Sequence, residues 1–84
     1  MKRVEKVRSI EVYAFDNEHY IDIVEDDETY EAWLYRRDYG FKTMMFGFPI
    51  TQQSKEAFID IVAMNVNEYL PMYYKELNIL EQEN

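Results

Sequence analysis

The chain has 84 residues, of which 48% are hydrophobic and 17% aromatic, and its formal net charge at pH 7 is −8. This length provides one domain, residues 1–84, without room for a second core, and the aromatic content is typical of a folded rather than a disordered chain. There is no cysteine, which excludes disulfide bonds and thiolate metal sites.

Apolar side chains alternate with other residues through positions 10–48, and this period of two is typical of strands. Turn-forming residues interrupt the alternation at 16–18, 26–28 and 38–40. The sequence therefore predicts four strands, roughly at 4–15, 19–25, 29–37 and 41–48.

The register of these strands follows from the turns expected between them. We expect two-residue turns at 17–18 and 27–28, and a three-residue loop at 38–40 with Gly40 in the left-handed conformation. These three turns, chosen separately, agree on one continuous aliphatic face, which we expect to be the core side of an antiparallel meander. The cross-strand pairs expected on it are Ala14–Ile21, Val12–Ile23, Ile23–Ala32, Ile21–Leu34, Leu34–Met44 and Ala32–Phe46.

After Pro49 the apolar positions follow the helical period of about 3.6 residues, which predicts a helix roughly over 52–81. Thr51 and Ser54 are both candidate N-caps. Pro71 lies on the polar side of this helix, so we expect one helix kinked at Pro71; a break just before it is the alternative. The apolar arc consists of Phe58, Ile59, Val62, Ala63, Val66, Tyr69, Leu70, Tyr73, Leu77 and Leu80. A fainter stripe beside it, interpreted as the edge of the core, consists of Ile61, Asn65, Glu68, Met72 and Ile79.

The expected fold class is therefore α+β, a four-stranded antiparallel β-meander with one long C-terminal helix packed on one sheet face. A single helix covers one face only, so large side chains on the second face stay at least partly exposed. The predicted register places Tyr13, Asp22, Trp33 and Met45 in one row across that face, and Phe15, Tyr20, Tyr35 and Thr43 in the next. An exposed aromatic cluster indicates a binding surface. The alternative is that these aromatics only pair across strands and stabilise the sheet.

The charges are unevenly distributed along the chain. Residues 9–35 contain nine carboxylates and no lysine or arginine. Such a region repels phosphate, so we expect no direct nucleic-acid binding and a protein partner with a basic surface, although plain solubility is an alternative role. The expected partner-binding residues are Tyr13, Phe15, Tyr20, Asp22, Glu25, Asp26, Asp27, Glu28, Glu31, Trp33, Tyr35 and Met45.

No constellation of residues predicts catalysis. His19, the only histidine, stands beside a turn without a cysteine, and the two serines, Ser9 and Ser54, belong to other elements. We interpret His19 as a solvated turn residue. The acidic run 25–28 lacks the glycine and the alternating ligands of a calcium loop. We therefore expect no catalytic residue, no cofactor and no metal ion.

No secretory signal and no membrane span is expected, because the longest apolar run covers only residues 61–64. We expect a cytoplasmic protein without a membrane partner. In size, acidity and tyrosine content the chain is similar to small phage-encoded antagonists, such as anti-CRISPR proteins and the inhibitor of uracil-DNA glycosylase; no motif is shared, so no residue roles are implied. The leading hypothesis is an inhibitor or regulator, and the alternative is a homo-oligomeric structural domain whose interface is the aromatic sheet face. An enzyme and a small-ligand or peptide binder are the remaining hypotheses.

Overall fold

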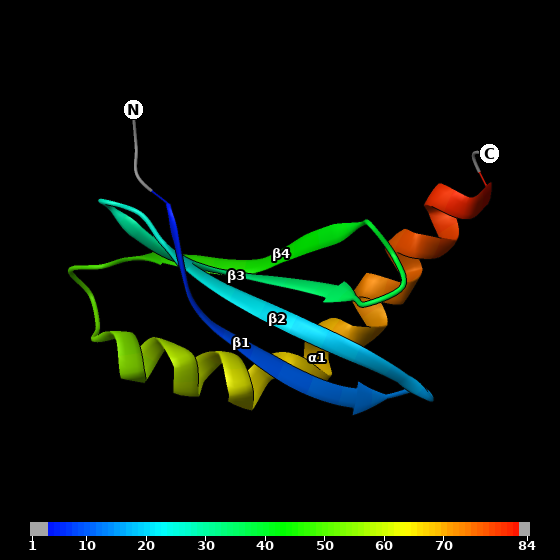
Figure 1. Ribbon diagram of the computed structural model, residues 1–84, viewed down its shortest axis with the longest axis horizontal. Coiled ribbons are helices and arrows are strands. Elements are labelled where there is room, and N and C mark those ends of the chain that lie inside the picture. Colours follow the sequence, from blue (N-terminus) through cyan, green and yellow to red (C-terminus); the bar gives the residue numbers. More distant parts are fainter. Residues whose placement is uncertain (1–3, 83–84) are drawn as a thin grey trace.

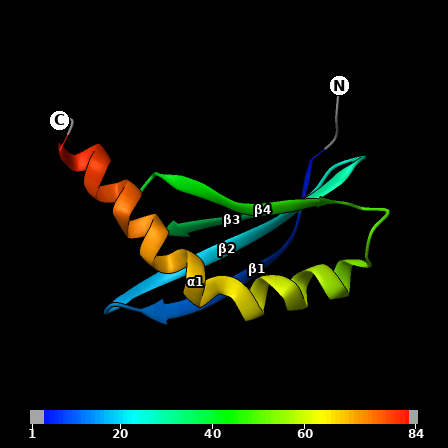
Figure 2. The same cartoon turned by 180° about the vertical axis from the view of Figure 1, so that it is seen from behind.

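The computed structural model describes residues 4–82 and contains one sheet and one helix. The strands pair in sequence order, each antiparallel to the next, and α1 crosses one face of the sheet (Figures 1 and 2). This arrangement confirms the predicted α+β meander. The elements are β1 (Glu5–Ala14), β2 (Asn17–Glu25), β3 (Thr29–Arg36), β4 (Lys42–Pro49) and α1 (Lys55–Gln82).

The core lies between α1 and the aliphatic face of the sheet, as the sequence predicts. β2 and β3 are the central strands and supply its fully buried sheet residues, whereas β1 at the edge supplies partly buried ones. Ala63 and Leu80 of the predicted helical arc are exposed. The buried hydrophobic residues are Ile21, Ile23, Tyr30, Ala32, Leu34, Met45, Phe58, Ile59, Val62, Val66, Leu70, Tyr73 and Leu77.

The start of α1 is set by Ser54. Its Oγ accepts a hydrogen bond from the Ala57 amide at 3.2 Å, and its carbonyl accepts one from the Phe58 amide at 3.0 Å. Ser54, rather than Thr51, is thus the N-cap, and the helix begins later than predicted. Pro71 lies inside one continuous helix, which bends about midway along its length (Figures 1 and 2). A break before Pro71 is excluded.

The register predicted for the first hairpin is wrong. Val12 pairs with His19 rather than with Ile23, a displacement of four residues along β2. The turn consists of Phe15 and Asp16, whose φ angles of 52° and 60° are both left-handed. Two such residues suit the right-handed twist of a tight hairpin, although glycine or asparagine is usual there. Because the displacement is even, Val12 keeps its predicted face.

The second turn is confirmed, with Ile23 opposite Ala32. Asp26 explains its position, because Oδ1 accepts hydrogen bonds from the Glu28 and Thr29 amides, each at 2.7 Å. A carboxylate that bonds main-chain amides two and three residues ahead stabilises a tight turn.

The third connection differs from the prediction. Five residues, 37–41, separate β3 from β4, and Gly40 does not have a positive φ. In β4, Met45 forms a bulge, because Ala32 pairs with Phe46 whereas Trp33 pairs with Met44. The extra residue reverses the predicted faces, so that Met45 is buried and Met44 is 48% exposed.

The bulge also moves Thr43. It stands opposite Leu34, where Met44 was expected, and its hydroxyl donates a hydrogen bond to the Glu76 carboxylate of α1. Thr43 therefore belongs to the helix side of the sheet and not to the aromatic face.

Candidate partner-binding surface

The face of the sheet opposite α1, called the outer face below, is not covered by another element of the described chain (Figures 1 and 2). Successive residues of a strand point to opposite faces, so the register assigns its members. They are Lys6, Ser9, Glu11, Tyr13, Glu18, Tyr20, Asp22, Val24, Glu31, Trp33, Tyr35, Lys42 and Met44.

Three aromatic side chains form the centre of the outer face. Tyr20 and Tyr35 are cross-strand partners with stacked rings whose centroids lie 5.7 Å apart. Trp33 follows on β3, and its Nε1 donates to Glu31 Oε1 at 3.3 Å. All three are half-buried, whereas Tyr13, near the end of β1, is 72% exposed. The cluster is thus rigid and partly shielded without a second layer.

Asp22 is buried in this face although the face is open. Its carboxylate accepts a hydrogen bond from Ser9 Oγ at 3.0 Å and lies 3.2 Å from Lys42 Nζ. The same Lys42 Nζ stands 4.5 Å from the centre of the Tyr35 ring, a cation–π contact. A buried charge needs such compensation, so Asp22 organises the face and is not available as a free anion.

Ion pairs with later elements interrupt the acidic region in space. Besides Asp22 with Lys42, Glu18 lies 3.2 Å from Arg37 and Glu25 lies 3.6 Å from Lys55. The basic partners Arg37, Lys42 and Lys55 all follow residue 35 in the sequence. The carboxylates of residues 9–35 therefore look unpaired in the sequence, but the folded chain neutralises some of them.

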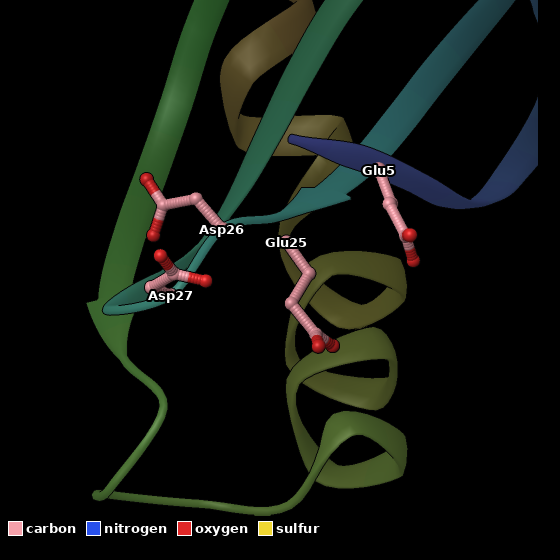
Figure 3. Close-up of a pocket in the computed structure, with 4 residues that line it drawn as sticks. All are labelled: Glu5, Glu25, Asp26 and Asp27. Carbon is pink, nitrogen blue, oxygen red and sulfur yellow. The ribbon is translucent and has the colours of Figure 1, made fainter. Parts of the chain in front are cut away.

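One end of the sheet, called the acidic end below, carries Glu5, Glu25, Asp26 and Asp27, which line a hollow of about 190 Å³. Figure 3 shows the carboxylates of Glu25, Asp26 and Asp27 around the turn from β2 to β3, with Glu5 on neighbouring β1. Within residues 4–82, no group of three or more potential ligands is placed to hold a metal ion.

A second hollow, of about 410 Å³, lies on the outer face between Trp33 and the acidic end. Its lining is Val4, Asp22, Val24, Glu31, Trp33 and Lys42. Val4 and Val24 directly precede Glu5 and Glu25 along the chain, so the two hollows lie at the same end of the sheet, although Glu25 points to the helix side. Comparisons with protein-family models, curated proteins and solved structures gave no match. The function must therefore be inferred from the chemistry of this surface.

Two residues predicted for the surface lie elsewhere. Met45 is in the core because of the bulge in β4. Phe15 is in the first turn, where its ring meets the Tyr74 ring of α1 edge-on, with centroids 5.1 Å apart. Among the helices of the described chain, none is long and apolar enough to cross a membrane.

The prediction for His19 is wrong, because its side chain is fully buried. The turn starts two residues earlier than expected, and His19 therefore lies inside β2 and faces the helix. Its Nε2 lies 2.7 Å from the Tyr74 hydroxyl, and its Nδ1 makes no hydrogen bond of normal geometry within residues 4–82. The rings of Tyr73 and Tyr74 both meet the imidazole edge-on.

Tyr73 extends this cluster to the loop between β3 and β4. Its hydroxyl accepts from the Arg36 amide at 2.9 Å and donates to the Phe41 carbonyl at 3.1 Å. The Arg36 guanidinium binds both oxygens of Asp38, at 2.8 and 2.6 Å. Burial raises the pKa of Tyr73. The cluster closes one end of the core, and the spacing of these residues in sequence gives no signal of it.

His19 predicts a pH dependence of stability. Burial lowers its pKa below the ordinary value of about 6.5, while main-chain groups of Val12 and Asn17 act in the opposite direction. Below pH 6.5 the unfolded chain therefore binds a proton more readily than the folded one. We expect the urea midpoint to be constant above about pH 7 and to fall as the pH is lowered from about 6.5 to 5.5, a window above the ordinary carboxylate range.

The matched control is His19→Gln, which keeps a polar side chain and removes the titration. Its urea midpoint should not change over this window. A wild-type midpoint without a decrease, or an equal decrease in His19→Gln, would contradict the assignment of this titration to His19.

Proposed function

We propose that the protein is a small, non-enzymatic interaction module of the cytoplasm, an inhibitor or regulator that binds the basic, nucleic-acid-binding surface of a partner protein. The observation that carries this proposal is the position of the acidic end at one end of the same sheet whose outer face carries the aromatic centre. A surface that combines the two offers carboxylates to a basic groove and rigid rings to its rim.

The two parts have different roles in binding. The acidic end, together with a net charge of −8, attracts a basic surface and speeds encounter. Trp33, Tyr20 and Tyr35 are already held by their neighbours, so they lose little conformational freedom on contact and suit the role of anchors. This division resembles that of phage-encoded antagonists, which supply carboxylates where phosphates would bind.

The mixed charge of the outer face favours a second candidate, a homodimer through this face. Lys6 and Lys42 stand on it with four carboxylates, Glu11, Glu18, Asp22 and Glu31, so its formal charge is smaller in magnitude than the −8 of the whole chain. A second copy could therefore pack on it with opposite charges in contact. In that case Trp33→Ala should yield monomers in light scattering.

Charge reversal at the acidic end tests the leading candidate. Asp26 holds the turn through its Oδ1, so the reversal is made at its neighbours, Asp27→Lys with Glu28→Lys. For a partner captured from host lysate and purified, we expect the association rate to fall by roughly tenfold and the dissociation rate to change little. Trp33→Ala should instead speed dissociation. Stopped-flow or surface-plasmon measurements at low and high salt separate the two rates.

The matched control reverses Glu56 and Asp60, two exposed carboxylates on α1 that produce the same net charge. An association rate reduced equally by this control would show that only the overall charge matters. A captured partner that binds no nucleic acid, or that keeps its nucleic acid when the protein binds, would contradict the proposed function.

A further inference from the structure

The side of α1 that faces away from the sheet carries a row of exposed side chains, called the helix stripe below. Its members are Met64, Glu68, Met72, Lys75 and Ile79, at the three- and four-residue spacing that places residues on one side of a helix. Three of its members, Glu68, Met72 and Ile79, were expected at the edge of the core but are exposed. The apolar members Met64, Met72 and Ile79 are 81%, 54% and 49% exposed. Single exposed apolar residues are ordinary, whereas a row on one helix face indicates an interface.

The charges of the stripe form no ion pair with another residue of the part of the chain that the structure describes. Glu68 and Lys75 are exposed, and the ion pairs of the described residues involve neither of them. Along the helix, Glu68 and Lys75 are separated by equal numbers of residues from the midpoint between Pro71 and Met72. The two apolar ends, Met64 and Ile79, are likewise equidistant from this midpoint.

The stripe is therefore complementary to itself when a second copy runs antiparallel. A twofold axis at the midpoint brings Glu68 of one copy to Lys75 of the other, and Met64 to Ile79, with Met72 beside the axis. Each contact then occurs twice, as in any isologous interface. A parallel arrangement would instead set Glu68 against Glu68 and Lys75 against Lys75.

The crossing point of the two helices defines where they touch. Helices that cross at an angle are closest at the crossing point and separate toward their ends. The contact is therefore centred on Met72, Glu68 and Lys75, and Met64 and Ile79 lie at its ends.

We propose that two copies of the protein associate through the helix stripe, with their α1 helices crossing antiparallel at Met72. The contact is small, which places the dimer among weak, reversible complexes. The outer face lies on the opposite side of the sheet from α1 (Figures 1 and 2), so both outer faces stay free. The inference is independent of the proposed function; if both hold, the dimer is bivalent.

Cysteine cross-linking tests the position of the twofold axis. The chain has no native cysteine, so only the introduced thiols can form a disulfide bond. Met72→Cys places two thiols beside the axis, and we expect a disulfide-linked dimer under mild oxidation. Met64→Cys is the control: it is the more exposed position, but in the dimer its two copies lie roughly 22 Å apart along the axis. Met72→Cys should therefore cross-link at least about tenfold faster than Met64→Cys. Faster cross-linking of Met64→Cys, which exposure alone would produce, or equal rates for the two variants, would overturn the proposal.

Charge exchange provides a second, solution test by analytical ultracentrifugation at concentrations up to about 1 mM, as a weak interface requires. Glu68→Lys and Lys75→Glu should each weaken self-association by roughly tenfold, because attraction turns to repulsion at two places. Mixing these two variants should restore the dimer as a heterodimer, and so should both changes in one chain. Asp60→Lys, on the exposed side of α1 but outside the stripe, should have no such effect. A wild-type protein that is monomeric throughout this range, or variants that the mixture does not rescue, would refute the interface.

Discussion

Replacing Leu34 with aspartate is expected to abolish folding. Leu34 is fully buried at the centre of β3, where it meets the core residues of α1. An aspartate there has no compensating charge and loses its hydration, at a cost of about 5 kcal/mol or more. That cost is comparable with the whole stability of a domain of this size, about 5–15 kcal/mol. Circular dichroism and the dispersion of the amide NMR spectrum report the loss directly.

The matched control is Tyr13→Asp in β1. Tyr13 is 72% exposed, so we expect a folded protein whose unfolding free energy changes by less than about 1 kcal/mol. Unfolding by Tyr13→Asp together with a folded Leu34→Asp would show that the two faces of the sheet are exchanged.

Two neighbouring methionines carry the second prediction. Met45→Asp is expected to destabilise the protein by about 3–5 kcal/mol, because the bulge turns Met45 into the core. Met44→Asp introduces the same side chain one position earlier, where the residue is about half exposed, and should cost less than about 1 kcal/mol. Urea unfolding of both variants at neutral pH gives the comparison.

This pair distinguishes the bulged strand from a regular one. In a β4 without a bulge the alternation would continue, Met44 would face the core, and the order of the two effects would reverse. Equal effects from both substitutions would also be incompatible with the bulge.

The number, order and pairing of the elements were predictable because they depend on repeated patterns. The alternation at Ile21, Ile23, Ala32 and Leu34 and the helical period from Phe58 onward each involve several residues, so one irregular position does not alter them. The turn at Asp26 was predictable for a local reason, its bonds to the amides ahead of it.

The details that failed depend on single residues whose neighbours come from distant parts of the chain. Phe15 and Asp16 adopt left-handed conformations that their residue types disfavour, and the Phe15 ring gains a contact with Tyr74 of α1. The bulge at Met45 inserts one residue into an otherwise regular alternation. Neither has a signal in the local sequence.

The candidate surface was predictable in part. Tyr20, Trp33 and Tyr35 share the outer face because the second register was right. The compensation of Asp22 by Lys42 was not foreseen, since Lys42 lies outside the acidic region in sequence and reaches it only across the sheet. The burial of His19 followed from the shifted first turn.

The two irregular strands also affect how the protein behaves at high concentration. An open sheet has two edges with unpaired main-chain groups, and a straight edge is a template for strand addition and aggregation. Here both edge strands are irregular: β1 shifts register between Lys6 and Arg8, and β4 carries the Met45 bulge and ends at Pro49. Bulges, charged side chains and proline are known protections of such edges. Deleting Met45 would therefore straighten an edge as well as disturb the core, and fibrous aggregates rather than soluble unfolded chains are the expected product.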